Sequence, residues 1–552
     1  MTLERQTGSD GRSLETSAIR DEDIDFHGGA LGADKRAKES NNDASAEVKI
    51  PFSKWPMMIR DEDNPWETVA HPAENQTKWV VPKFWSLPLH NGKLMSREFA
   101  MKIGTCAAAN SHGEWNRGAD CPLHQRTIFV MIASYRDFQC RETVEQIYTR
   151  ASFPGRIRVG IVDQIVEGHD NHCDQPAQSC DIDPNQALCK YHDLIEAVVM
   201  DAENAVGPVP ARHVGSRMYR GEYYAMQIDA HISFVNNWEM SLIQELEASG
   251  NEMAVLSTYL SDVVNSIDEE GNSRRPARPI MCNSRWQQGP GGYHVHHSTQ
   301  PESMPYIHGT PTLHPWWSAG FSFARGHFSV NVPYDLYLPM VFSGEEMQIA
   351  MRAWTIGYDL YTPERSVCFH HYAESPEGIE KRKGVPTFWE HAAKYEGAGA
   401  KGMRRLLGII HMNPEVDPKD WDHTDEWIYG IGGVRKPEKL MEIIGMNFVN
   451  KTVESRLCRF VNINARMHKI FTRHLRVDGM GINYARINYR YKYNPNADPA
   501  DDVQETMEDQ GDEVPMEKNN TADADAEEEE GDEESDEGDD GGDAKDGAAE
   551  VQ

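Results

Sequence analysis

The feature that most constrains the fold is a continuous apolar run, Thr127–Ser134, which has charged residues on both sides. Such a run is typical of a parallel strand buried on both faces. Val144, Ile147 and Tyr148 follow at the spacing of one helix face. A second apolar run, Ile157–Asp163, completes strand, helix and strand. This succession is a βαβ unit, and it predicts an open α/β sheet.

Further strands and helices alternate through the region that follows. We expect strands at 223–229, 254–259, 318–324 and 359–362, with helices at 211–220, 237–249 and 345–356. In open α/β sheets, ligands bind at the carboxyl ends of the strands. The first candidates for a site are therefore the polar residues after strand ends: Ser134–Asp137, Asp163 with Gln164, and Asp229–His231.

Composition divides the chain into five segments. Residues 1–50 contain too few large apolar side chains to offset the entropy of ordering, which predicts disorder. Tryptophans scattered among prolines in 51–126 indicate an ordered but irregular leader that packs on the next domain. The α/β domain spans 127–372, and a mainly helical extension occupies 373–498. Residues 499–552 form a low-complexity acidic tail that we expect to be disordered.

Charge is distributed unevenly along the chain. The formal net charge is −33, but residues 501–552 alone carry 24 acidic side chains against two lysines. The remainder is modestly acidic, which argues against a nucleic-acid binder, because such proteins need clustered Lys and Arg. The tail has three open roles: solubility or spacing, docking to a basic partner, or shielding of the basic stretch 484–493.

The sequence gives no sign of a membrane span or a secretion signal. No run approaches the roughly 20 consecutive apolar residues of a spanning helix, and the first residues lack the apolar core of a signal peptide. The nine cysteines are odd in number and mostly unclustered, which suits reduced thiols. We therefore expect a cytoplasmic or nuclear protein with no membrane partner.

The most informative window is Tyr223–Phe234, in which an apolar strand delivers Asp229 and His231 at positions i and i+2. Extended backbone past the strand end puts both side chains on one side. Together they can bind a divalent ion such as Mn²⁺, which neutralises a diphosphate. A lone D-x-H is a weak signal, and a helix-start aspartate with a surface histidine is the alternative. His370 or His371 is the candidate third ligand.

Charged residues at two helix starts are further candidates. Glu345 and Glu346 open one predicted helix, where they either complement its dipole or position an acceptor hydroxyl. Arg212 lies near the start of another helix, from which its guanidinium can reach a phosphate.

Six motifs in a fixed order resemble one known family. They are Ile132–Asp137, Gly207–Arg212, Gln227–His231, Pro315–Phe321, Phe342–Glu346 and Phe369–Tyr372. The family comprises the cytoplasmic polypeptide N-acetylglucosaminyltransferases that modify hydroxyproline on the adaptor subunit of SCF ubiquitin ligases. The chain is more distantly similar to the mucin-type polypeptide GalNAc-transferases, which share a D-x-H metal motif. The resemblance covers residues 127–372 and extends to Trp427–Gly432 with Arg435.

The resemblance implies a GT-A type, Rossmann-like nucleotide-sugar-binding domain and a metal-dependent transferase that retains anomeric configuration. It implies that Mn²⁺ is bound by Asp229, His231 and His370, with His371 as the alternative. The implied donor is UDP-GlcNAc, which Arg212 and Asp229 would help to bind. Its uridine side would be held by Ser134, Tyr135 and Asp137, and its sugar pocket would be lined by Trp317, Ala319 and Gly320. Glu345 and Glu346 are the implied catalytic contacts to sugar or acceptor. The implied protein partner is the SCF adaptor, and the oligomeric state is left open.

Other interpretations remain open at this stage. The same fold can serve another UDP-sugar or acceptor, or a non-catalytic scaffold. The residues around Gly289–Gly292, including His294, His296 and His297, form either a mobile lid or a solvated loop. The pair Trp316-Trp317 lies either in the core or in a sugar pocket. A zinc site, or a zinc-dependent hydrolase, can be built on one Cys/His group: His169, His172, Cys173, Cys180, Cys189 and His192.

Overall fold

The computed structural model describes residues 65–487, apart from 87, 276–277, 290–291, 298–301, 304–306, 374 and 454–456. The segments predicted to be disordered, 1–50 and 499–552, lie outside the described residues. So do the first part of the predicted leader and residues 488–493 of the basic stretch.

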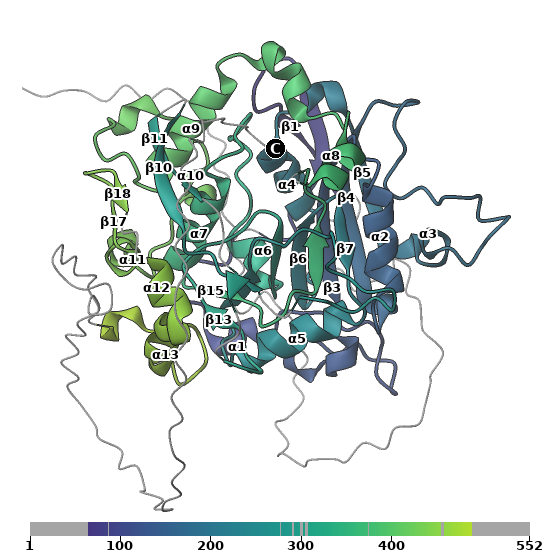
Figure 1. The fold of residues 1–552 in the computed structure, drawn as a ribbon, viewed down its shortest axis with the longest axis horizontal. Helices are drawn as coiled ribbons and strands as arrows, with labels where there is room; N and C mark the ends of the chain where they lie inside the picture. Colours follow the sequence, from purple (N-terminus) through teal and green to yellow (C-terminus); the bar gives the residue numbers. More distant parts are fainter. Residues whose placement is uncertain are drawn as a thin grey trace, which may run out of the picture.

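A sheet of eight strands, in the order β13-β15-β8-β14-β6-β3-β4-β5, runs through the middle of the molecule (Figure 1). The expected βαβ unit is β3 (Ile128–Tyr135), α2 (Cys140–Thr149) and β4 (Ile157–Ile165), with β3 and β4 parallel. Strand β6 (Tyr224–Asp229) is parallel to the other side of β3. Every residue of β4 is buried, as its continuous apolar sequence predicts. The predicted α/β fold is confirmed.

The other half of the sheet is mixed. Strand β14 (Phe321–Arg325) runs antiparallel to both neighbours, β6 and β8 (Ala254–Ser257). Strand β15 (Asp359–Thr362) is parallel to β8, and the short β13 (Thr312–Leu313) closes that edge. The strand predicted at 318–324 begins only at Phe321, because Ser318 forms a bridge to Phe321 that places two residues in a turn.

Strand β5 (Ile195–Asp201), parallel to β4, was not predicted. It is an edge strand whose side chains are mostly half-buried or exposed, so it lacks the apolar run of a central strand. A short strand outside the large sheet was also missed: β7 (Ile232–Phe234), which pairs antiparallel with β16 (Cys368–His370). This small pair matters because it joins two distant parts of the chain beside the end of β6.

The predicted helices between the strands are present as α4 (Pro208–Ser216), α5 (Trp238–Ala248) and α7 (Glu345–Ile356). Before the sheet, β1 (Trp66–Ala70) and β2 (Lys78–Pro82) form a hairpin within the leader. The leader packs on the chain that links α4 to β6, where the ring of Trp85 meets that of Tyr219 edge-on at 5.4 Å between centroids.

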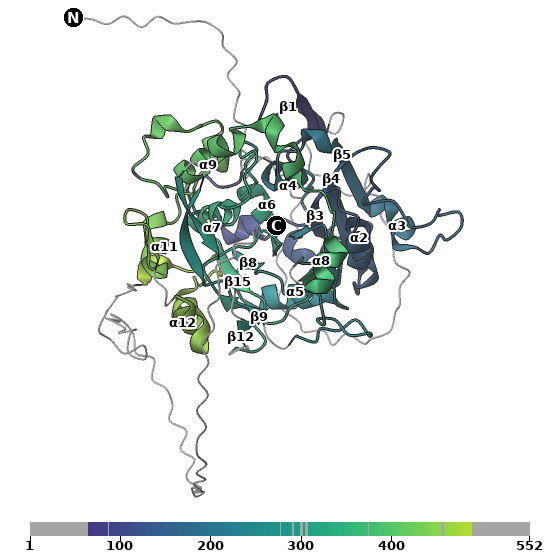
Figure 2. The same ribbon diagram turned by 45° about the horizontal axis from the view of Figure 1, so that its top comes forward.

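The segment after residue 372 is mainly helical, as predicted. Its elements are α8 (Pro376–Arg382), the 3₁₀ helix η8 (Phe388–Tyr395), α9 (Ala398–Ile409), α10 (Glu426–Tyr429), α11 (Pro437–Ile444), α12 (Leu457–Asn462) and α13 (Arg466–Phe471). Helix α8 lies beside β4 and α2, whereas α11 and α12 lie on the opposite side of the molecule (Figures 1 and 2). Within the described part of the chain, no helix combines the length and apolar character needed to span a membrane.

The prediction of reduced thiols is wrong, because eight of the nine cysteines are paired. The disulfides are Cys106–Cys121, Cys140–Cys173, Cys180–Cys189 and Cys282–Cys458. Partners are 9 to 176 residues apart, so pairing is set by the fold and cannot be read from local spacing. The zinc interpretation also loses its ligands, because zinc binds thiolates and all three of its cysteines are in disulfides.

We expect a thiol titration to find one cysteine in the denatured, unreduced protein, because Cys368 alone is unpaired. Native protein should react slowly, since Cys368 is buried and burial raises the pKa of its thiol. The measurement is reaction with a thiol reagent, native, in denaturant, and in denaturant after reduction. Nine reactive thiols per chain in the denatured protein before reduction would contradict the disulfide pairing.

Candidate functional site

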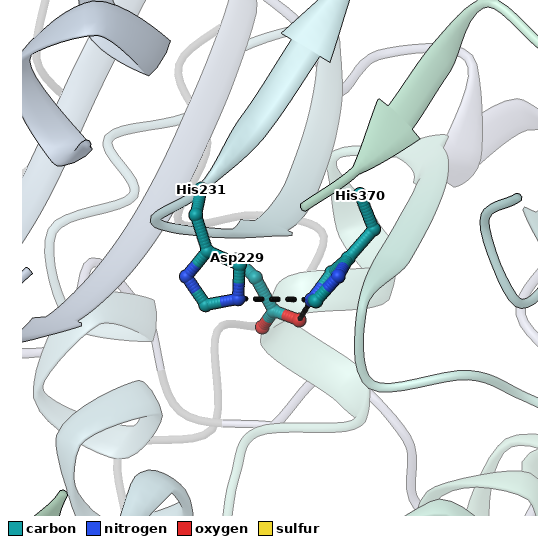
Figure 3. Close-up of side chains that lie close together, drawn as sticks. All are labelled: Asp229, His231 and His370. Atoms are coloured by element: carbon teal, nitrogen blue, oxygen red, sulfur yellow. Dashed lines mark hydrogen bonds and ion pairs between the residues drawn. The ribbon is translucent and has the colours of Figure 1, made fainter. Parts of the chain in front are cut away.

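Three predicted metal ligands come together at the carboxyl end of β6 (Figure 3). Asp229 is the last residue of β6, His231 precedes β7, and His370 ends β16. His370 Nε2 lies 2.9 Å from His231 Nε2 and 3.4 Å from Asp229 Oδ2. Because β7 pairs with β16, two histidines that are 139 positions apart in the sequence share one cluster.

The ring of His231 is oriented by Asp137, just beyond the end of β3. His231 Nδ1 lies 2.7 Å from Asp137 Oδ2, and this oxygen also accepts a hydrogen bond of 3.0 Å from Arg382 of α8. Burial alone raises the pKa of Asp137, but the His231 hydrogen bond and the charges of His231 and Arg382 hold it well below its usual range. An ionised Asp137 fixes Nδ1 as the donor and leaves Nε2 facing the cluster. The resemblance implies a uridine contact for Asp137, whereas its contacts here place it behind His231.

Of the two adjacent histidines, His370 faces the cluster and His371 does not. His371 Nε2 lies 2.9 Å from Ser233 Oγ, and its Nδ1 lies 3.3 Å from Lys381 Nζ. Burial lowers the pKa of His370 to about 4, so its imidazole is neutral at pH 7, the form that binds metals. The geometry favours His370 over His371 as a third ligand.

The residues of the cluster suit a divalent transition ion. One carboxylate oxygen and two imidazole nitrogens lie within 4.8 Å of one another. Mixed nitrogen and oxygen ligands of this kind are compatible with Mn²⁺, which prefers about six ligands. Three protein ligands therefore leave positions for substrate oxygens.

Arg212 of α4 links this cluster to α7. Its guanidinium lies 2.7 Å from both carboxylate oxygens of Glu345 and 2.7 Å from Asp229 Oδ1. Burial alone raises the pKa of Asp229, but the His370 hydrogen bond and the Arg212 charge hold it well below its usual range. Arg212, expected at a donor phosphate, is here the bridge between the half-buried Asp229 and the buried Glu345.

Glu346 has different partners from Glu345. Its carboxylate accepts a hydrogen bond of 2.9 Å from the backbone N–H of Ala319 and another from the hydroxyl of Tyr259. Burial raises the pKa of Glu346 to about 7, against the opposing effect of these hydrogen bonds. Glu346 therefore titrates near neutral pH, beside the turn that precedes β14.

We expect Glu346 to make the fold less stable as the pH rises from about 4.5 to 7. Its pKa is 4.5 in an unfolded chain and about 7 here, so in this window the folded protein binds more protons. The stability is present below pH 4.5 and lost through pH 7, by about 1–3 kcal/mol. Glu346→Gln should remove this dependence in urea unfolding at pH 5 and pH 8. Glu380→Gln, on the exposed face of α8, is the control, and equal pH profiles for both variants would contradict the assignment.

The turn before β14 brings backbone close to the cluster. The carbonyl of Ala319 accepts a hydrogen bond of 2.7 Å from the Gln227 side chain, which fixes the turn on β6. A Cβ added to Gly320 would lie 3.3 Å from Asp229 Oδ2. Trp317 is buried, and its ring centroid is 6.2 Å from that of Tyr334. Trp316 is buried too, so both indoles belong to the core, and the sugar contact predicted for Trp317 stays a prediction.

Gly320→Ala should weaken Mn²⁺ binding about tenfold, because the new methyl group displaces the Asp229 carboxylate by a few tenths of an ångström. Isothermal titration with Mn²⁺ measures this directly. Gly384→Ala is the control: Gly384 has φ +78° and open space around it, so the change strains backbone without touching the cluster. Equal Mn²⁺ affinities for the two variants would show that Gly320 has no influence on Asp229.

The side chains at the end of β3 are in contact with η8. The Tyr135 hydroxyl and the Arg136 guanidinium both bind the carboxylate of Glu390, at 2.9 Å for Arg136. Arg136 also pairs with Asp170 at 2.8 Å. Ser134 is buried, and its hydroxyl has no hydrogen-bond partner among the described residues. The residues expected at the uridine thus lie together, beside a segment of the C-terminal extension.

Three residues that contact the site were not predicted: Tyr259, Arg382 and Glu390. Tyr259 ends the strand predicted at 254–259, so the rule that sites follow strand ends contained the signal. Arg382 and Glu390 come from the chain after residue 372, where no local pattern marks them.

The segment with the predicted lid forms a hairpin of β10 (Ser284–Gly289) and β11 (Gly292–His297). His294 is buried in it, and the side chains of His296 and His297 lie outside the described residues. The predicted lid movement stays a prediction.

A protein-family model described as Glycosyltransferase (GlcNAc) matches residues 127–189 and 176–450, which is more than half of the chain. No curated protein sequence matches the chain. Among solved structures, the chain is similar to GalNAc-T7 with UDP, GalNAc and Mn²⁺, at 15% identity and a TM-score of 0.38. That match covers 60% of this chain and 58% of the GalNAc-T7 chain, so less than two thirds of that protein is spanned.

Two other solved structures show weaker likeness. S. aureus TarS 1-349 in complex with UDP-GlcNAc matches at 12% identity and a TM-score of 0.28, over 55% of this chain and 75% of that one. The mannosyltransferase PcManGT from Pyrobaculum calidifontis, in complex with GDP-Man and Mn²⁺, matches at 12% identity and a TM-score of 0.27, over 52% and 75%.

Proposed function

The chain belongs to the Glycosyltransferase (GlcNAc) family, and from this premise we propose that it transfers N-acetylglucosamine from UDP-GlcNAc to a hydroxyl group of a protein. The observation that carries the proposal is the cluster of Asp229, His231 and His370 at the carboxyl end of β6. In an α/β enzyme with a parallel sheet, the nucleotide binds at the carboxyl ends of the strands, and this is where these metal-binding side chains lie. A non-catalytic scaffold has no need of such a cluster.

Asp229, His231 and His370 would hold the metal ion, which when bound supplies positive charge for the diphosphate and for the departing UDP. The surrounding residues keep these ligands in the required state. Asp137 fixes the tautomer of His231. Arg212 keeps Asp229 ionised and ties it to Glu345 of α7.

The donor pocket would lie between the end of β3 and the turn before β14. Ser134 and Tyr135 would contact the uridine side, and Ala319 and Gly320 the sugar. The turn is anchored by Gln227 and Glu346, so its backbone is positioned before substrate arrives. Glu346, whose pKa is about 7, would exchange a proton near the acceptor end of this pocket at neutral pH.

Two acceptors compete within this proposal. Hydroxyproline of the SCF adaptor is the acceptor implied by the resemblance, and it places the enzyme in the cytoplasm. The four disulfides favour an oxidising compartment instead, because disulfides are rare in cytosolic proteins. They favour Ser or Thr of a protein in such a compartment as the acceptor.

UDP release from a panel of UDP-sugars, with Mn²⁺ and with chelator, tests the proposal. We expect release from UDP-GlcNAc that stops on addition of chelator. Release from another UDP-sugar alone would keep the enzyme class and change the donor. No release and no UDP binding would move the scaffold interpretation to the front. Peptides with a central Ser, Thr or hydroxyproline then separate the acceptors.

A further inference from the structure

A cavity of about 280 Å³ lies beside the metal cluster, and none of the roles above uses it. Its walls are the loop 262–265 that follows β8, the residues after β16, and helix α8. The loop is distant in sequence from the other two segments, which follow one another. The volume is near the lower limit of small-molecule pockets, about 300 Å³, so the cavity is too small for a whole nucleotide sugar.

One aromatic ring separates this cavity from the cluster. Tyr372 lines the cavity, and its ring lies on the ring of His370 with 4.0 Å between centroids and 31° between planes. Arg382 also lines the cavity and reaches Asp137 behind His231. A group bound in the cavity therefore flanks the reacting position without occupying it.

A buried carboxylate oxygen in this wall lacks a donor. Asp262 Oδ1 accepts a hydrogen bond of 2.7 Å from the backbone N–H of Val264. Asp262 Oδ2 is inaccessible to solvent and has no hydrogen-bond partner among the described residues. An unmatched buried acceptor is costly, so this oxygen suits a ligand that brings an N–H group.

The other walls are apolar or cationic. Val263 and Val264 provide an apolar surface next to Asp262. Lys381 stands at the exposed rim, 3.3 Å from His371 Nδ1, where its ammonium is available to a carbonyl oxygen. One acceptor, one donor and an apolar wall within a short span match a peptide group with a side chain attached.

We propose that this cavity binds the backbone of the acceptor polypeptide, next to the residue that receives the sugar. This rests on the proposed function, since it assigns a subsite of the same enzyme. A turn of the Asp262 side chain would bring Oδ2, which is shielded from solvent here, to the peptide N–H, and a neighbouring carbonyl would face Lys381. A nucleotide diphosphate fits less well, because the carboxylates of Asp262 and Glu377 line the cavity and Arg382 is already paired with Asp137.

Asp262→Asn tests the hydrogen bond. The asparagine keeps the bond to Val264 through its oxygen but presents an N–H where the peptide needs an acceptor. Val264→Phe tests the space by filling the cavity. The probes are ten-residue peptides with a central Thr, Ser or hydroxyproline, assayed with UDP-GlcNAc and Mn²⁺. The control is Asp268→Asn, a carboxylate three residues beyond the loop whose hydrogen bonds, among the described residues, stay within 268–272.

Both cavity variants should raise the KM for peptide about tenfold and leave the Kd of UDP within twofold, and Asp268→Asn should change neither. A weaker Kd for UDP with an unchanged peptide KM would overturn the assignment and make the cavity part of the donor site. The proposal would also be overturned if the wild-type enzyme released UDP at a rate that none of the peptides changed. Failure of the proposed function is distinct, since the wild type would then neither bind UDP nor release it.

Discussion

Replacement of Asp229 by Asn is expected to lower metal-dependent UDP-sugar turnover about 1,000-fold while the protein remains folded. Asp229 is the one anionic member of the cluster, and its Oδ2 lies 3.4 Å from His370 Nε2. Asparagine has the same shape but no charge, so the cluster keeps its geometry and loses most of its attraction for a divalent ion.

Mn²⁺ titration and thermal unfolding separate this effect from misfolding. The variant should bind Mn²⁺ at least about 100-fold more weakly, and Mn²⁺ should no longer raise its melting temperature. Asp181→Asn, in the exposed loop after β4, is the matched control and should behave as the wild type. Undiminished turnover with unchanged Mn²⁺ affinity would remove Asp229 from the metal site.

Sequence predicts best those strands in which all residues share one environment, because the residue pattern then shows that environment directly. Strands β3, β4 and β6 are buried on both faces, and their apolar runs predict them within one or two residues. The edge strand β5 has one side exposed to solvent, so its sequence contains no continuous apolar run. The disulfides were missed for a related reason: pairing depends on which chain segments meet, and Cys282 meets a partner 176 residues away.

The sequence identified residues of the candidate site, but it did not reveal the contacts that these residues make. The D-x-H pattern located Asp229 and His231, because strand geometry alone puts them together. The choice between His370 and His371 needed the register of β16 against β7, which a sequence does not reveal. Arg212 shows the same limit: its position was foreseen, but its two carboxylate partners come from separate elements, β6 and α7.

Asp137 illustrates how the extension changes a role. From the sequence it is a polar residue after a strand, expected beside the nucleotide. In the structure Arg382 of α8, 245 positions away, pairs with it and directs it to His231. A segment outside the recognisable motifs thus helps to set the state of His231, a predicted metal ligand.

Arg212→Leu is expected to destabilise the protein by about 3–5 kcal/mol, because it leaves the buried carboxylate of Glu345 and the half-buried one of Asp229 without their partner. Glu345→Gln in the same chain should recover part of that loss, since one of the stranded charges is then gone. Urea unfolding of the two single variants and the double variant measures the coupling between Arg212 and Glu345.

Mn²⁺ distinguishes this pair from an ordinary buried ion pair. Without Arg212, Asp229 and Glu345 form a more negative site, so Mn²⁺ should stabilise Arg212→Leu more than it stabilises the wild type. Arg405→Leu is the matched control, because Arg405 and Asp335 form a fully buried ion pair, 2.8 Å apart and outside the cluster. It should lose similar stability and gain nothing extra from Mn²⁺. Equal rescue of both arginine variants would mean that Arg212 supports the fold alone and has no part in the metal site.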